Sequence, residues 1–146
     1  MADKLILLVE DDPDDEELTM RALRKANVAN EIAIARDGQE ALDFVFCEGA
    51  YADRPPLLPI AILLDLKLPK LDGVDFLRRL RGNERTKHIP VVMLTSSGEQ
   101  EDMERAYAAG ANSYIRKPVD FADFADAVAR LAVYWGSLNA DLTDRR

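Results

Sequence analysis

The sequence predicts an α/β fold, a doubly wound sheet of five parallel strands with helices on both faces. Strand-like and helix-like segments alternate five times along the chain, which indicates five consecutive βα units. Three of the strand-like segments are unbroken apolar runs, a pattern typical of parallel strands that are covered on both faces. Connections between parallel strands are almost always right-handed, and helices packed in this way fill both faces of the sheet.

The first βα unit is predicted near the N-terminus. Leu5–Val9 is an unbroken apolar run and predicts a strand. A helix follows over Asp14–Ala26, where apolar residues recur at helical spacing. Pro13 stands where a helix can begin, and the acids after it suit the positive end of the helix dipole. The strand therefore runs directly into a group of acidic residues.

The second unit carries weaker signals. Glu31–Ala35 predicts a short strand, Asp37-Gly38 predicts a turn, and Gln39–Glu48 predicts a helix. The stretch that follows, Gly49–Pro59, contains three prolines. It predicts a connection without secondary structure, longer than is usual between the elements of such a fold.

The third unit begins with the apolar strand Ile60–Leu64, which ends abruptly on Asp65. Pro69 and the pair Asp72-Gly73 mark a turn after this strand. Val74–Arg81 then predicts a short helix, because its apolar residues recur every three positions and can face the core together.

The last two units complete the alternation. The apolar strand Val91–Thr95 precedes a helix over Gly98–Ala109, which the glycine after it brings to an end. A short fifth strand over Ser113–Arg116 leads to a last helix over residues 120–135. The remaining residues are polar and predict a frayed end.

Length and composition favour one globular domain. The 146 residues suit a single domain over 1–146, with a core over about 4–136 and a flexible tail over 137–146. The net charge of −8 argues against nucleic-acid binding, which depends on basic side chains that neutralise phosphates. No apolar run approaches the ~20 residues that span a bilayer, and the N-terminus lacks a signal-peptide pattern. We therefore expect no membrane contact and a cytoplasmic location.

Acidic residues follow two of the apolar strands at the point where each strand ends. Glu10 and Asp11 come after the first strand, and Asp65 comes after the third. Neighbouring parallel strands end at the same edge of the sheet, where ligands gather in open α/β folds. Carboxylates held close together repel one another, and a bound cation relieves this repulsion. Ligands that are all oxygen favour a hard ion, and Mg²⁺ above all.

Asp65 can also act as a nucleophile. A carboxylate can attack phosphorus and form an aspartyl phosphate, and this transfer needs positioning and charge neutralisation from the protein. Thr95 ends the fourth strand and offers a hydroxyl donor, and Lys117 follows the fifth strand and offers a fixed cation. Each of these residue types is common on its own. Their joint placement at strand ends favours phosphoryl transfer.

Four segments resemble the motifs of the receiver domain of bacterial two-component response regulators. They are 7–13 (LLVEDDP), 63–73 (LLDLKLPKLDG), 91–96 (VVMLTS) and 110–118 (GANSYIRKP). The four motifs occur in the family's order, and the resemblance covers nearly the whole chain, which makes it highly specific. It implies a flavodoxin-like fold with strand order 2-1-3-4-5.

The resemblance also implies a metal site. Asp65 corresponds to the phosphoacceptor of the family. Asp11 and Asp65 correspond to direct ligands of Mg²⁺, and Glu10 corresponds to an acid that acts through water. The backbone carbonyl of Lys67, two residues after the phosphoacceptor, corresponds to the third protein ligand.

The remaining family positions imply a switch. Thr95 and Lys117 correspond to the hydroxyl and the lysine that contact the phosphoryl group. Tyr114 corresponds to an aromatic side chain that turns inward when the Thr95 hydroxyl moves toward the phosphoryl group. The bond between Lys117 and Pro118 is expected to be cis, as is usual in the family.

A closer resemblance is to the small single-domain regulators that serve bacterial phytochromes. It rests on the connection around Pro55-Pro56, on Asn112–Tyr114, on Val119–Phe121 and on the Tyr134-Trp135 ending. It implies that a sensor histidine kinase, of the bacteriophytochrome type, donates the phosphoryl group. Apolar residues that flank the core stripe of the last helix, together with the family, imply a homodimer through the fourth helix, the fifth strand and the fifth helix.

Two other functions compete with this interpretation. A phosphatase with an aspartyl-phosphate intermediate would use the same nucleophile and Mg²⁺, but such enzymes usually need a second acid where this chain has Lys67. A receiver-like interaction module that is never phosphorylated would not need the complete set of site residues. We therefore expect a signalling protein and not an enzyme. We expect no DNA-binding output, because the predicted elements leave no helix-turn-helix.

Overall fold

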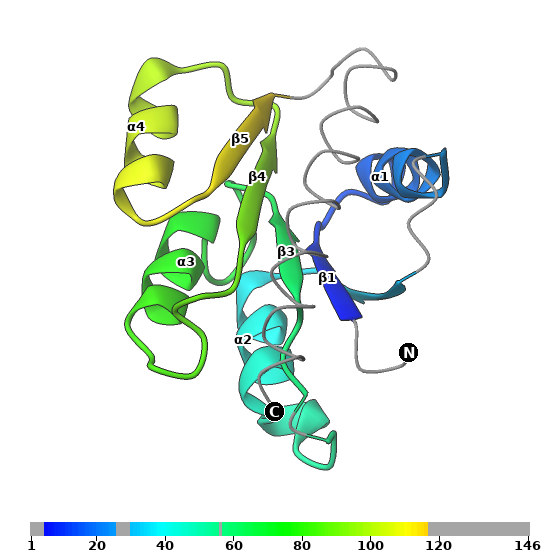
Figure 1. The fold of residues 1–146 in the computed structure, drawn as a ribbon. Coiled ribbons are helices and arrows are strands. Elements are labelled where there is room, and N and C mark those ends of the chain that lie inside the picture. Colours follow the sequence, from blue (N-terminus) through cyan, green and yellow to red (C-terminus); the bar gives the residue numbers. More distant parts are fainter. Residues whose placement is uncertain (1–4, 26–29, 56, 117–146) are drawn as a thin grey trace, which may run out of the picture.

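The computed structural model describes residues 5–25, 30–55 and 57–116. Five parallel strands form one sheet in the order β2-β1-β3-β4-β5 (Figure 1). The strands are β1 (Leu5–Val9), β2 (Glu31–Ala35), β3 (Ala61–Leu64), β4 (Val91–Thr95) and β5 (Ser113–Arg116). All neighbouring strands pair in parallel. The predicted fold class and the strand order 2-1-3-4-5 are confirmed.

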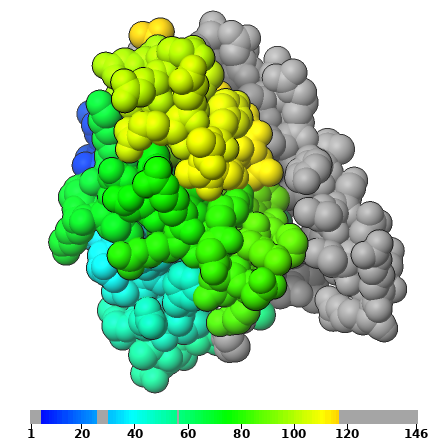
Figure 2. All heavy atoms as spheres, turned by 90° about the vertical axis from the view of Figure 1, so that its left-hand side faces the viewer, coloured from blue at the N-terminus to red at the C-terminus, as the bar shows by residue number. Residues whose placement is uncertain are grey.

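Helices cover both faces of this sheet. Helices α2, α3 and α4 lie on one face and α1 lies on the other (Figure 1). Their bounds are α1 (Pro13–Lys25), α2 (Gly38–Phe46), α3 (Gly73–Arg81) and α4 (Gln100–Ala108). Seen from their own side, α2, α3 and α4 form a continuous band over the first face (Figure 2).

Alternate residues of the central strands supply two separate cores. In β1, Leu7 and Val9 pack with residues of α2 and α3, whereas Ile6 and Leu8 pack with residues of α1. Successive side chains of a strand point to opposite faces, so an unbroken apolar run fills both cores at once. Every residue of β1, β3 and β4 is buried as a result. Polar chemistry is left to the strand ends.

The connection after α2 differs from its prediction. It contains a short 3-10 helix, η1 (Gly49–Tyr51), where the sequence predicts no secondary structure. Arg54 donates two hydrogen bonds to the Phe44 carbonyl oxygen, at 3.1 and 2.7 Å, and its guanidinium lies 3.9 Å from the centre of the Phe44 ring. The Tyr51 ring meets the same ring edge-on at 5.2 Å. These contacts satisfy a carbonyl at the end of α2 and pack the connection against that helix.

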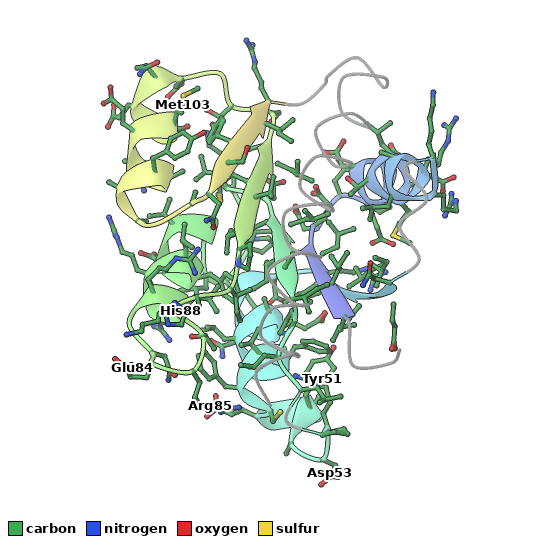
Figure 3. The ribbon with its side chains drawn as sticks, in the orientation of Figure 1. Tyr51, Asp53, Glu84, Arg85, His88 and Met103 are labelled. Atoms are coloured by element: carbon green, nitrogen blue, oxygen red, sulfur yellow. The ribbon has the colours of Figure 1, made fainter. Side chains whose placement is uncertain are left out.

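This packed connection lies far from the edge at which β4 and β5 end. Figure 3 shows Tyr51 and Asp53 at the opposite end of the molecule. The connection therefore packs against α2 at the end of the molecule opposite to the site described below, and it does not contribute to that site.

Helix α4 begins at Gln100, two residues after its predicted start at Gly98. Glu99 has an extended backbone, with φ −76° and ψ 132°, and its N–H donates to the Ser97 hydroxyl oxygen at 3.3 Å. The helix ends at Ala108, one residue before its predicted end at Ala109. Gly110 follows the helix with φ 109°, a left-handed conformation that glycine adopts without strain.

One half-buried arginine joins the segments that lead into β4 and β5. The Arg81 guanidinium donates to the carbonyl oxygens of Lys87, Ile89 and Gly110 at 2.7 to 3.1 Å. It also donates to Asn112 Oδ1 at 3.0 Å, and that oxygen accepts the Val91 N–H at 2.8 Å. Burial lowers the pKa of Arg81. The end of α3 is thereby joined to the segments that lead into both strands.

Several predictions concern residues outside the described ranges. They are the last helix over 120–135, the tail over 137–146, Lys117 and the cis bond at Pro118. The predicted single-domain bounds also stay a prediction. Among the residues that the structure describes, no helix has the length and apolar character needed to cross a membrane.

Candidate functional site

The carboxyl ends of β1 and β3 lie side by side. Val9 pairs with Leu64 in the parallel register. The pairing continues one step further, because the Asp65 N–H donates to the Val9 carbonyl oxygen at 3.1 Å. On the other side of β1, the Glu10 N–H donates to the Ala35 carbonyl oxygen of β2 at 2.9 Å. Backbone hydrogen bonds therefore hold the residues that follow both strands at one edge of the sheet.

These strand ends bring three carboxylates together. One oxygen from each of Glu10, Asp11 and Asp65 lies within 4.8 Å of the other two. Glu10 is only 1% exposed, Asp65 is half-buried and Asp11 is exposed. Oxygen ligands lie roughly 2.1 Å from Mg²⁺ and roughly 2.3–2.6 Å from Ca²⁺, so ligands on opposite sides of such an ion are about 4–5 Å apart. The spacing and the all-oxygen set fit a hard divalent cation.

Asp12 caps helix α1. Its Oδ1 accepts the N–H of Asp14 at 2.8 Å and the N–H of Asp15 at 3.4 Å. N–H groups in the first turn have no partner within the helix, and a side-chain oxygen at this position supplies one. The Asp12 N–H also donates to Glu10 Oε2 at 3.3 Å. Asp12 thus serves the start of the helix and helps to orient the buried acid beside it.

The loop between β3 and α3 returns tightly beside Asp65. The Lys67 N–H donates to Asp65 Oδ1 at 3.3 Å, and the Gly73 N–H donates to the Leu66 carbonyl oxygen at 2.8 Å. A Cβ atom on Gly73 would lie 2.3 Å from the Asp65 carbonyl oxygen. Only glycine allows this approach, which explains the Asp72-Gly73 signal of the sequence.

The start of α2 contacts the same loop between β3 and α3. The Gly38 N–H donates to the Pro69 carbonyl oxygen at 3.3 Å, and a Cβ atom on Gly38 would lie 1.9 Å from the Leu71 carbonyl oxygen. Lys70 has a left-handed backbone, with φ 68°, and its Nζ lies 3.6 Å from Asp37 Oδ2. The sequence predicted only a turn at the start of α2, because a contact between two loops leaves no periodic signal.

The end of β4 and the middle of β5 place two predicted switch residues on one sheet face. Met93 pairs with Tyr114, and side chains two residues apart in a strand share a face, so Thr95 lies on the Tyr114 side. Thr95 is 1% exposed, and its Oγ1 accepts the Ser97 N–H at 3.3 Å. The Tyr114 hydroxyl donates to the Ser97 carbonyl oxygen at 3.0 Å. The backbone of Ser97 therefore links Thr95 to Tyr114.

Two residues of this region escaped the sequence interpretation. The Ser97 hydroxyl donates to Asp102 Oδ2 at 2.5 Å, and Asp102 lies in the first turn of α4 with only 7% of its surface exposed. Burial raises the pKa of Tyr114, the hydrogen bond to Ser97 lowers it, and the negative charge of Asp102 raises it. Asp102 and Ala106 are the buried residues of α4. Their spacing of four marks the inner face of a helix, and a carboxylate on that face was the available signal.

A hollow of about 380 Å³ opens between α4 and the loop that follows β3. Its walls are Asp11, residues 66–69, Asp72, Asp102 and Arg105. Asp11 belongs both to this hollow and to the carboxylate cluster. Asp11 is therefore the residue of the cluster that faces this hollow.

The predicted lysine contact lies outside the described residues. β5 ends at Arg116, which pairs with Thr95 at the same edge of the sheet. Lys117 is the next residue, and its predicted role stays a prediction. The structure thus brings together Glu10, Asp11 and Asp65 and joins Thr95 to Tyr114.

The sequence matches one protein family over most of its length. Residues 6–129 match the response regulator receiver domain. The probable methanogenesis regulatory protein FilR2 of Methanothrix harundinacea (strain 6Ac) is 41% identical over 132 residues, which are 90% of this chain and 83% of that protein. The response regulator Rcp1 of Synechocystis sp. is 37% identical over 132 residues, 90% of this chain and 88% of that protein.

Solved structures show the same likeness. The bacteriophytochrome response regulator AtBRR is 51% identical with a TM-score of 0.77, and the match covers 90% of this chain and 94% of that one. The Mn²⁺-bound form of Rcp1 is 37% identical with a TM-score of 0.78, covering 90% and 94%. The phosphorylated cyanobacterial phytochrome response regulator RcpA is 36% identical with a TM-score of 0.79, covering 92% and 95%.

Proposed function

Because the chain belongs to the response regulator receiver domain family, we propose that it accepts a phosphoryl group on Asp65 from a sensor histidine kinase, in a Mg²⁺-dependent reaction. The observation that carries this proposal is the cluster of three carboxylate oxygens, within 4.8 Å of one another, at the carboxyl edge of the sheet. Such a cluster supplies both a nucleophile and the ligands of a cation. The phosphoryl group then switches a protein-binding surface.

The residues around Asp65 suit a divalent cation. Asp11, Asp65 and the backbone carbonyl of Lys67 would be the direct ligands, and Glu10 would act through water. The crystal structure of Rcp1 with Mn²⁺ supports a divalent ion in a related protein. When bound, the ion neutralises charge on the carboxylates and on the phosphoryl oxygens. Mg²⁺ is the proposed natural ion, since it combines one or two carboxylates with phosphate oxygens.

Asp65 performs the transfer as the nucleophile. One of its carboxylate oxygens attacks the phosphorus of a phosphohistidine, an O–P bond forms, and the N–P bond breaks as the imidazole nitrogen takes the electron pair and a proton. The product is an acyl phosphate on Asp65 and a free histidine on the kinase. The Thr95 hydroxyl and the Lys117 ammonium would then contact the oxygens of the new group.

The added charge would bias a switch between β4 and β5. A phosphorylated side chain adds roughly −1.5 to −2 charge and several strong acceptor oxygens. Thr95 moves toward this charge, and Tyr114 lies where it can follow, because both residues contact Ser97. The surface formed by α4 and β5 changes with them. The structure of phosphorylated RcpA supports phosphorylation in a related protein.

The partners follow from the relatives. AtBRR and RcpA are phytochrome response regulators, and we propose a bacteriophytochrome as the kinase. We also propose a homodimer through α4, β5 and the predicted last helix. Tyr107 on α4 is 47% exposed, which leaves a large apolar side chain on this face. Light scattering at micromolar concentration, with and without phosphorylation, tests the dimer, and a monomer in both states would exclude it.

Intact-protein mass spectrometry after incubation with acetyl phosphate and Mg²⁺ tests the phosphoacceptor. The wild-type chain should gain the mass of one phosphoryl group, and Asp65→Asn should gain none. Asp12→Asn is the matched control, because asparagine caps a helix as well as aspartate and Asp12 lies beside the same cluster. Phosphorylation of Asp65→Asn at the wild-type level would overturn the proposal.

A further inference from the structure

Asp102 is a buried carboxylate for which the proposed chemistry has no use. It is 7% exposed and lies on the inner face of α4, next to the hollow beside the site. Burying a charged group is costly unless hydrogen bonds compensate for the lost water. The Ser97 hydroxyl supplies such a hydrogen bond to Asp102, at 2.5 Å.

The contact of Asp102 with Arg105 is weaker. Arg105 Nη1 lies 3.5 Å from Asp102 Oδ1, and the Arg105 side chain is 45% exposed. Exposed ion pairs at this spacing contribute little, because water and salt screen them. The carboxylate is therefore fixed mainly by the loop that precedes α4.

Ser97 is the residue at which the switch elements meet. Its N–H donates to the Thr95 hydroxyl oxygen at 3.3 Å, and its carbonyl oxygen accepts the Tyr114 hydroxyl at 3.0 Å. Its own hydroxyl accepts the Glu99 N–H at 3.3 Å while donating to Asp102. Three of these partners belong to three different elements: β4, β5 and α4. A shift of Ser97 would therefore change contacts with all three elements.

We propose that Asp102 is a positioning residue of the switch, which holds Ser97 so that its carbonyl oxygen accepts the Tyr114 hydroxyl. Asp102 touches neither Thr95 nor the phosphoacceptor; it acts through Ser97. The inference rests on the proposed function of Thr95 and Tyr114 as a switch. It adds that the inward position of Tyr114 depends on a hydrogen-bond acceptor on α4, the Asp102 side chain.

Fluorine NMR of the full chain labelled with 3-fluorotyrosine tests this proposal. Tyr114→Phe assigns the Tyr114 signal, and the exposed Tyr107 supplies a reference for a tyrosine in water. In unphosphorylated Asp102→Ala and Ser97→Ala, the Tyr114 signal should move toward that reference. A hydrogen bond to a charged acceptor is strong enough to change the ratio of inward to outward Tyr114 by about tenfold. Ser97→Ala keeps the backbone carbonyl, so its effect reports position and not a missing acceptor.

Two further variants separate positioning from general damage. Asp102→Asn keeps an oxygen that accepts the Ser97 hydroxyl and should retain the wild-type Tyr114 signal. Glu101→Ala removes an exposed acid from the same turn of α4 and should also leave the signal unchanged. An unmoved Tyr114 signal in both Asp102→Ala and Ser97→Ala would overturn the proposal, as would an equal movement in Glu101→Ala.

The outcome is independent of the phosphoacceptor test. If acetyl phosphate fails to modify wild-type protein, the proposed function fails, while the comparison of unphosphorylated variants still reports on Asp102. If wild-type protein is phosphorylated and the Tyr114 signal ignores Asp102, only the positioning role fails.

Discussion

The backbone N–H of Asp65 donates to the carbonyl oxygen of Val9 at 3.1 Å, one step beyond the paired residues of β1 and β3. The candidate phosphoacceptor therefore stands on the sheet itself and not on a free loop. Its position relative to Glu10 and Asp11 is fixed by backbone geometry. Substitutions of side chains in the cluster should change its chemistry and leave the fold in place.

The first prediction concerns the cation. Asp11→Asn should weaken binding of Mn²⁺ by at least about tenfold, because it removes one negative charge from the set of ligands. Isothermal titration calorimetry measures the affinity. The Asp12→Asn variant should bind as the wild type does, since Asp12 caps α1. Equal affinities of wild type and Asp11→Asn would show that the cluster is not the site.

The second prediction concerns the support of the β3–α3 loop. Gly38→Ala should lower the free energy of unfolding by about 1–3 kcal/mol, because the new Cβ would lie 1.9 Å from the Leu71 carbonyl oxygen and must displace the loop. The same displacement should weaken Mn²⁺ binding through the Lys67 carbonyl. Urea unfolding and calorimetry measure the two effects.

Gly82→Ala is the matched control for this loop. A Cβ on Gly82 would lie 3.4 Å from its nearest neighbour, the Arg78 carbonyl oxygen, and Gly82 lies at the far end of α3. This variant should change neither stability nor metal affinity by a comparable amount. A Gly38→Ala protein with wild-type metal affinity would separate the loop support from the metal site.

The third prediction concerns Arg81. Arg81→Lys should lower the free energy of unfolding by about 1.5–3 kcal/mol, because a lysine cannot reach the several carbonyl oxygens that the planar guanidinium joins. Arg79→Lys, an exposed neighbour on α3, should be nearly neutral. Thermal unfolding of both variants measures the difference, and equal stabilities would contradict the structural role of Arg81.

The fourth prediction concerns alkaline pH. The pKa of Tyr114 is raised from its usual 10.0, with burial as the largest cause, so the folded state holds this proton more tightly than the unfolded state. The resulting stability is fully present below the unfolded pKa and is lost as pH rises through the folded pKa. Stability should therefore fall above about pH 10, and Tyr114→Phe should lose less over that range. Urea unfolding between neutral pH and pH about 11 measures this, and parallel curves would contradict it.

Much of the fold was predictable because its strands are buried on both faces. Leu5–Val9 is an unbroken apolar run, Val91–Leu94 is another that ends on Thr95, and the observed strands are Leu5–Val9 and Val91–Thr95. The carboxylate cluster followed from where these runs end. Strand order could not be derived from periodicity, since every central strand has the same pattern; it came from the resemblance to receiver domains.

The parts that were missed depend on individual side-chain contacts between neighbouring elements, which leave no periodic pattern in the sequence. In the connection that contains η1, Arg54 and Tyr51 pack on Phe44. The proline content of this connection predicted no secondary structure and gave no sign of these contacts. The role of Asp102 depends on α4 starting at Gln100, which leaves Ser97 in the loop to meet it. A polar pair of this kind has no apolar periodicity to reveal it.

The register of β4 divides the site into two halves of different construction. Pairing between β3 and β4 extends only to Met93, so Thr95 is held by β5 and by Ser97, whereas Asp65 is held by β1. We therefore expect substitutions to separate the proposed phosphoryl chemistry from the proposed signal output. Substitutions at Ser97 or Asp102 should change how strongly a regulator of this kind responds, without altering the residues proposed to receive the phosphoryl group. Related chains could therefore differ in sensitivity while they use the same chemistry.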